Sequence, residues 1–162
     1  RSKGGNILSG MDLLGAIAED NVPSTKAPDP YMHIFLDAGN GSILAFFELP
    51  NSPPMGRDPN TPEWTQHIAF AVKDMAAFEE AHKRALDAKL DIVGPTDHTI
   101  FKSIYFYDPS GHRLEVVVET ATAEQLQRMK DLAPRMVEEW SQNKRPPRHM
   151  SWLHEKELAT VQ

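Results

Sequence analysis

The feature that most constrains the fold is the order of patterns in residues 65–120. An apolar strand opened by His67 comes first, a helical pattern follows, and three further strand segments complete the stretch. The last of these strands carries Glu115 inside a valine-rich run. The stretch therefore predicts a βαβββ unit with an imidazole on its first strand and a carboxylate on its last.

The helix within this unit has a start signal and an apolar face. Asp74 is suited to cap a helix over about residues 75–89. Four residues recur at helical spacing and are expected to face the sheet: Phe78, Ala81, Ala85 and Leu86. Residues 108–111, Asp-Pro-Ser-Gly, predict a tight turn between the last two strands, because proline presets φ and glycine supplies positive φ.

The part of the chain before residue 51 predicts a smaller set of strands. Residues 32–37 and 42–49 fit two strands joined by an Asn-Gly turn. Both faces of the second strand are mostly apolar, so both are expected to be covered, and the carboxylate of Glu48 then needs a partner. Residues 11–19 fit a short helix, weakened by Gly15.

Composition and the positions of proline and glycine predict four segments in the chain. Residues 1–50 form a partial first module, residues 51–63 a proline-rich linker, residues 64–120 the second module, and residues 121–162 a helical extension. Thr122 and Gln125 fit a capping box at the start of the extension. Pro134 is expected to kink or divide its helix.

Charge and cysteine usage exclude several functions. The chain has 162 residues, a net charge of −6 and no cysteine. The negative charge argues against a nucleic-acid surface, and the lack of cysteine excludes disulfides and thiolate metal sites. No apolar run reaches the roughly 18 residues that span a bilayer. We see no signal peptide, and the cytoplasm is the default location.

Strand parity brings two candidate ligands together. His67 lies on one face of its strand with Ala69 and Ala71, whose small side chains leave room for a ligand. The first and last strands of a curved βαβββ unit can be neighbours, so Glu115 can approach the same cation. An imidazole and a carboxylate without cysteine suit Fe²⁺, Mn²⁺, Ni²⁺, Zn²⁺ or Co²⁺.

The pattern resembles one module of the vicinal-oxygen-chelate superfamily, which includes glyoxalase I, bleomycin and fosfomycin resistance proteins and extradiol dioxygenases. The motifs that carry the resemblance are residues 67–70 (HIAF), 97–98 (DH), 103–106 (SIYF), 108–111 (DPSG) and 114–115 (LE). The resemblance implies an α+β fold in which βαβββ modules form a cup-shaped mixed sheet.

The resemblance also implies where a metal binds. Metal ligands in this superfamily fall on the first and last strands of each module, which corresponds to His67 and Glu115 in the second module and to Glu48 in the first. A complete first module also begins with a histidine-bearing strand and a helix, which residues 1–30 do not contain. We expect that segment to precede Arg1 or to come from another chain, unless the site is incomplete.

Two further residues fit catalytic roles by the same resemblance. In extradiol dioxygenases, a tyrosine ten positions before the ligand glutamate hydrogen-bonds the substrate, and Tyr105 has this spacing from Glu115. His98 precedes the same strand and could serve as an acid or base.

These features favour a metal-dependent dioxygenase that cleaves a catechol-type substrate, with Fe²⁺ as the preferred ion. Two alternatives stay open. A glyoxalase I-type lyase is favoured by Glu48 as a second carboxylate, and a metal-free small-molecule binder of the bleomycin-resistance kind is favoured by the incomplete first module. Because modules pair to close the cup, we expect a homodimer with a small-molecule substrate and neither nucleic acid nor membrane as a partner.

Overall fold

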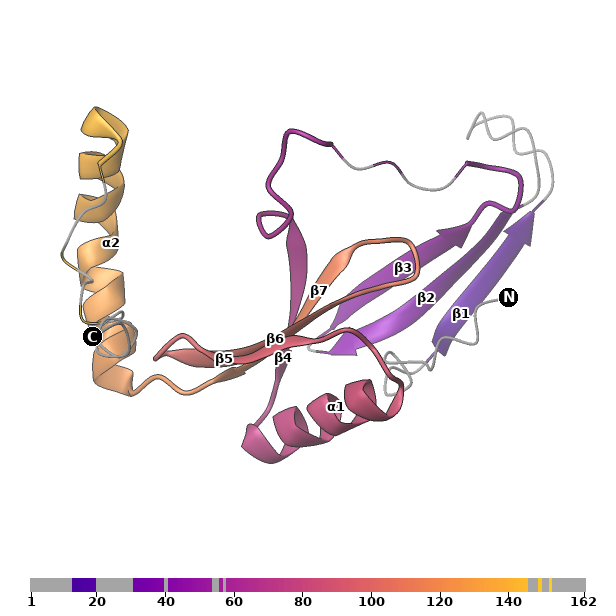
Figure 1. Ribbon diagram of the computed structural model, residues 1–162, viewed down its shortest axis with the longest axis horizontal. Coiled ribbons are helices and arrows are strands. Elements are labelled where there is room, and N and C mark those ends of the chain that lie inside the picture. Colours follow the sequence, from indigo (N-terminus) through magenta and orange to yellow (C-terminus); the bar gives the residue numbers. More distant parts are fainter. Residues whose placement is uncertain are drawn as a thin grey trace. The chain divides into compact units, whose positions relative to one another are not determined.

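The computed structural model describes residues 13–19, 31–39, 41–53, 56, 58–145, 149 and 152, without the side chains of residues 17–19. The described elements are strands and helices in the α+β class, in the order β1–β2–β3–β4–α1–β5–β6–β7–α2 (Figure 1). The chain divides into two compact units. One is Arg1–Gln66 with Tyr107–His112, and the other is His67–Phe106 with Arg113–Gln162.

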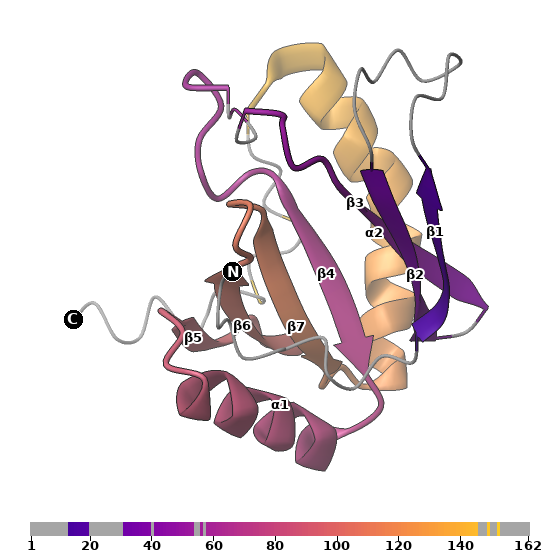
Figure 2. The same cartoon turned by 90° about the vertical axis from the view of Figure 1, so that its right-hand side faces the viewer.

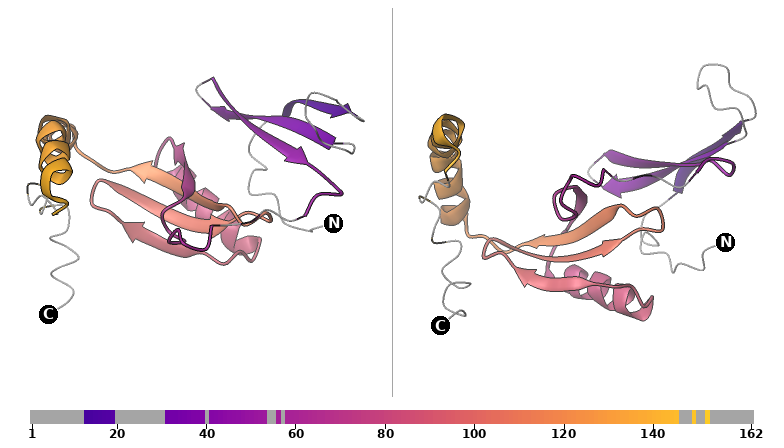
Figure 3. Two further views of the ribbon diagram at one scale, coloured as in Figure 1. Left: turned by 90° about the horizontal axis from the view of Figure 1, so that it is seen from above. Right: turned by 45° about the horizontal axis from the view of Figure 1, so that its top comes forward.

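The first unit contains an antiparallel three-stranded sheet in the order β1-β2-β3 (Figure 3). Its strands are β1 (Leu13–Glu19), β2 (Tyr31–Gly39) and β3 (Ser42–Glu48). The prediction of a short helix over residues 11–19 is therefore wrong for 13–19, which pair with β2. A short apolar run fits either structure, and pairing with a neighbouring strand decides between them.

One face of β3 is open. The side chains of Ile43 and Phe47 are 61% and 57% exposed, respectively, and Glu48 is exposed as well. The expectation that both faces of this strand are covered is therefore wrong for the face of Ile43 and Phe47. Glu48 lies on the other face and is itself exposed, so its carboxylate needs no buried partner.

The second unit contains a four-stranded sheet in the order β4-β7-β6-β5. Its strands are β4 (His67–Val72), β5 (Val93–Asp97), β6 (Phe101–Tyr107) and β7 (Arg113–Glu119). The first and last strands, β4 and β7, lie side by side and run parallel (Figure 2). The sequence prediction of a βαβββ unit that brings these two strands together is confirmed.

Helix α1 (Met75–Asp87) covers one face of this sheet (Figure 1). Asp74 caps it by accepting a hydrogen bond of 2.8 Å from the backbone N–H of Ala77, as expected for an aspartate at this position. Phe78, Ala81 and Ala85 are buried as predicted, whereas the predicted core residue Leu86 is 55% exposed. Leu86 follows Ala85 directly and so points about 100° around the helix from it.

Alternation along β6 and β7 separates an apolar face from a polar one. Five side chains fill the space between the sheet and α1: Ile104, Phe106, Leu114, Val116 and Val118. Their odd-numbered neighbours point to the opposite face of the sheet. That second face therefore carries the polar residues that the sequence places on these strands.

Gly94 fixes the position of the edge strand β5 against β6. Its φ is +116°, and a Cβ atom built on it would lie 2.7 Å from the backbone oxygen of Ser103. Only glycine fits this approach, because any side chain would clash with backbone and adopt a strained conformation. The pairing of β5 with β6 is irregular at this point, between Val93 and Thr96.

Helix α2 (Ala123–Asn143) follows the second module. The predicted capping box is present, with Thr122 accepting from the backbone N–H of Gln125 and the Gln125 side chain accepting from that of Thr122. Pro134 lies inside the helix without dividing it, and none of the helix residues is buried. Among the described helices, none has both the length and the apolar character to cross a membrane.

Candidate functional site

The parallel pairing of β4 and β7 brings His67 and Glu115 into direct contact. In the register of the two strands, Ala69 lies opposite Glu115 and His67 opposite Arg113. The His67 Nε2 atom is 2.9 Å from the Glu115 Oε2 atom, and the side chains are 31% and 6% exposed, respectively. The structure thus brings together the two residues that the sequence proposes as ligands, with the imidazole at the open side and the carboxylate beneath it.

Ser103 holds the other oxygen of this carboxylate. Its hydroxyl group donates a hydrogen bond to Glu115 Oε1, and Ser103 itself is fully buried. Both carboxylate oxygens are therefore engaged, which offsets the cost of burying a charge. The sequence analysis did not single out Ser103 as functional, although it lies two residues before Tyr105 and so on the same strand face.

Tyr105 and His98 form a second contact beside the first. The Tyr105 hydroxyl oxygen lies 3.0 Å from His98 Nε2, and the Tyr105 ring meets the His67 ring edge-on at 5.9 Å between centroids. Burial raises the pKa of Tyr105 above its ordinary value, and the Glu115 carboxylate adds to this, while a hydrogen bond with Ser103 and the charge of Arg113 oppose it. The phenol is therefore protonated near neutral pH and can donate a hydrogen bond.

Arg113 completes the group, and the sequence analysis missed it. Its Cζ atom lies 4.4 Å from the centre of the Tyr105 ring, within cation–π range. Strand parity places it on the same face as Glu115. That parity was the signal available in the sequence.

We refer to these side chains as the polar cluster. Its members are His67, His98, Ser103, Tyr105, Arg113 and Glu115, drawn from β4, β6, β7 and the residue after β5. The cluster lies on the sheet face opposite the apolar core. Four predicted site residues therefore belong to one group: His67, His98, Tyr105 and Glu115.

Glu48 is the predicted ligand that the structure does not join to this group. It ends β3 in the first unit, where its register partner is Met32. Its role as a metal ligand stays a prediction. Within the described residues, no three histidine, aspartate or glutamate side chains are grouped to hold a metal.

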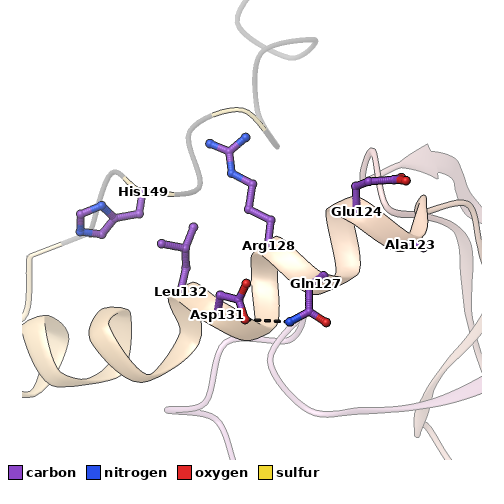
Figure 4. Close-up of a pocket in the computed structure, with 7 residues that line it drawn as sticks. All are labelled: Ala123, Glu124, Gln127, Arg128, Asp131, Leu132 and His149. Atoms are coloured by element: carbon purple, nitrogen blue, oxygen red, sulfur yellow. Dashed lines mark hydrogen bonds between the residues drawn. The ribbon is translucent and has the colours of Figure 1, made fainter.

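A separate open hollow runs along α2 (Figure 4). Its lining residues come from that helix and from His149: Ala123, Glu124, Gln127, Arg128, Asp131, Leu132 and His149. The Gln127 amide donates to Asp131 Oδ1 at 2.7 Å, and His149 Nε2 lies 3.0 Å from Glu139 Oε1. None of the predicted site residues lines this hollow.

Comparison with known proteins identifies the family of the chain. A family model described as the glyoxalase/bleomycin resistance protein/dioxygenase superfamily matches residues 11–116. A metallothiol transferase FosB from Shouchella clausii (strain KSM-K16) is 33% identical over 124 residues, which cover 69% of this chain and 83% of that protein.

Solved structures match the chain as well. A glyoxalase family protein from Bacillus cereus matches with a TM-score of 0.56 at 14% identity, covering 75% of this chain and 89% of that one. A glyoxalase/dioxygenase from Nostoc punctiforme matches with a TM-score of 0.49 at 27% identity, covering 72% and 79%. The chain belongs to the glyoxalase/bleomycin resistance protein/dioxygenase superfamily.

Proposed function

We propose that this chain is a metal-dependent enzyme that acts on a small molecule with two neighbouring oxygen atoms. The observation that carries the proposal is the 2.9 Å contact between His67 and the buried carboxylate of Glu115. A nitrogen and an oxygen donor at this separation can share one divalent cation, and Ser103 keeps the carboxylate in place. When bound, the cation supplies Lewis acidity and a template for the two substrate oxygens.

The remaining ligands come from outside the second unit in this proposal. Glu48 is the candidate within the chain, and a second copy of the chain is the other source. We therefore retain the homodimer as part of the proposal. Light scattering tests it directly, because a strict monomer that binds the cation tightly contradicts the need for a second copy.

Tyr105 and His98 have the geometry to handle a proton at the substrate. A protonated phenol next to His67 can donate a hydrogen bond to a substrate oxygen, which orients the substrate and stabilises negative charge on that oxygen. His98, in contact with the same hydroxyl group, can accept or return a proton. These roles require only the contact that the two side chains already make.

The finer proposal is ring cleavage of a catechol-type diol. It is supported by the Tyr105–His98 contact beside the His67–Glu115 pair. In this reaction both atoms of O₂ enter the product as the ring opens, and Fe²⁺ is the expected ion because a two-histidine, one-carboxylate set with open positions is typical of oxygen-activating iron. Among the described residues of this unit, no second histidine joins His67 and Glu115 in such a set.

A second candidate function is transfer of a thiol to a small oxygen-rich substrate. The relative at 33% identity is named a metallothiol transferase, and this similarity favours the reaction. In such a reaction the thiol sulfur forms a bond to carbon, and the displaced oxygen takes up a proton. Tyr105 and His98 could supply that proton, so the polar cluster is compatible with either chemistry.

The test begins with metal analysis of the purified chain and of two glutamate variants. Glu115→Gln removes a ligand in the proposal, whereas Glu119→Gln changes the same charge at the exposed end of the same strand. We expect stoichiometric metal in the parent chain and in Glu119→Gln, and at least a tenfold loss of metal affinity in Glu115→Gln. Equal metal content in all three proteins contradicts the proposed site.

Activity then separates the two reactions. Oxygen uptake with catechols by the Fe²⁺-loaded protein supports ring cleavage. Thiol-dependent consumption of an epoxide in the presence of Mn²⁺ or Ni²⁺ supports transfer, and thiol-dependent isomerisation of a hemithioacetal with Ni²⁺ or Zn²⁺ supports a glyoxalase-type lyase. Ligand binding that is unchanged in Glu115→Gln, with no metal in either protein, supports a metal-free binder.

A further inference from the structure

Arg113 places its guanidinium group over an aromatic ring and makes no ion pair among the described residues. Its Cζ atom lies 4.4 Å from the centre of the Tyr105 ring. No carboxylate among the described residues forms an ion pair with Arg113, and the nearest in sequence are otherwise engaged. Glu115 is held by His67 and Ser103, and Asp108 by His112 and the backbone of its turn.

The position of Arg113 puts its guanidinium group beside the place of a bound molecule. It starts β7, lies opposite His67 in the strand register and is half-buried. Arg113 shares a sheet face with Glu115, so a molecule held between His67 and Tyr105 lies within the reach of a long arginine side chain. The contact with a neutral ring leaves the positive charge of the guanidinium group without a carboxylate partner among the described residues.

We propose that Arg113 binds an acidic group of the substrate, so that the molecules accepted by this site carry a carboxylate, phosphonate or phosphate. This inference rests on the proposed function, because it places the substrate at the His67–Glu115 pair. The planar fork of N–H donors matches the two oxygens of such a group, which makes arginine suited to oxyanion recognition. The competing explanation is that Arg113 only supports the Tyr105 ring.

Binding measurements with paired ligands separate the two explanations. Calorimetric titration of the metal-loaded full chain with 3,4-dihydroxybenzoate and with catechol compares an acid with its neutral counterpart. We expect the acid to bind at least about tenfold more tightly to the parent chain, which is typical of one charge-assisted contact. In Arg113→Met this preference should disappear, and Arg113→Lys should keep part of it.

Arg84→Met is the matched control, because it removes the same charge from the exposed surface of α1. It should leave the preference unchanged. An equal loss of affinity for both ligands in Arg113→Met would show that the residue only supports Tyr105 and would overturn the inference. Equal binding of the two ligands by the parent chain would overturn it as well.

A metal-free arm keeps this test independent of the proposed function. Benzoate, phenylphosphonate and the neutral benzamide are titrated into protein treated with a chelator. If the two acids bind more tightly than benzamide to the parent chain but not to Arg113→Met, Arg113 recognises acids even where the proposed metal site has failed its own test. If neither acid is preferred in this arm or in the metal-loaded one, the inference is wrong while metal binding at His67 and Glu115 can still stand.

Discussion

The two sheets of this protein differ in what covers them. The sheet of β4 to β7 has α1 on one face and the polar cluster on the other. Eight of the nine buried hydrophobic residues in the described part of the chain lie on α1, β6 and β7. The sheet of β1 to β3 contributes a single buried hydrophobic residue among those described, Leu36, and exposes Leu13, Ile43 and Phe47. A helix on one face thus frees the other face of a sheet to carry charged and polar chemistry.

The largest expected difference concerns deletion of an apolar side chain from each sheet. Ile104→Ala should lower the free energy of unfolding by about 2–5 kcal/mol, because Ile104 is fully buried and its loss leaves a cavity. Phe47→Ala removes a larger side chain that is 57% exposed and should cost less than about 1 kcal/mol. Urea unfolding of the full chain measures both.

A comparable loss in the two variants would break the comparison. It would mean that Phe47 is covered in solution by something other than the described elements. Repeating the measurement over a range of protein concentrations then shows whether a second copy of the chain covers Phe47. At a dimer interface, the loss of unfolding free energy depends on protein concentration.

The next largest difference concerns a serine on each sheet. Ser103→Ala leaves one oxygen of the buried Glu115 carboxylate without its donor, which should cost about 1–3 kcal/mol. Ser42→Ala changes an exposed residue at the start of β3 and should stay within about 0.5 kcal/mol. Unfolding free energies of both variants, measured without added metal, check this order, and a neutral Ser103→Ala would show that the carboxylate does not depend on that bond.

The smallest expected effects separate the two helices. Asp74→Ala removes the cap of α1 and should lower global stability by about 1 kcal/mol, because this helix covers the core. Thr122→Ala removes the capping box of α2, a helix with no buried residue, and should loosen only its first turn. Amide hydrogen exchange distinguishes the two, and faster exchange throughout the second sheet in Thr122→Ala would contradict a locally independent α2.

Local patterns were sufficient to predict the second module from the sequence. Asp74 marks the start of α1, and the 3.6-residue period identifies three of its four predicted core residues. The parallel contact of β4 with β7 follows from the order of elements, and strand parity then places His67 and Glu115 on the same side. The contact of Tyr105 with His98 could be suspected from the resemblance alone, because no local pattern joins a loop histidine to a strand tyrosine.

The first sheet was harder to predict for a physical reason. Leu13 and its neighbours form a short apolar run that fits a strand or a helix, and the choice depends on pairing with β2, which is a tertiary contact. The prediction that the Glu48 carboxylate needs a partner assumed that this residue is buried, and it is exposed. Ser103 and Arg113 could be predicted only from strand parity, because neither serine nor arginine is a residue type that marks a metal site.

Gly94 connects the edge of the second sheet to its chemistry. The space for a side chain at this position is taken by the backbone oxygen of the same serine whose hydroxyl group holds Glu115. A side chain at this edge position would therefore disturb the polar cluster several residues away. Changes to the loops around the cluster can be tolerated, but position 94 must keep a hydrogen atom in place of a side chain.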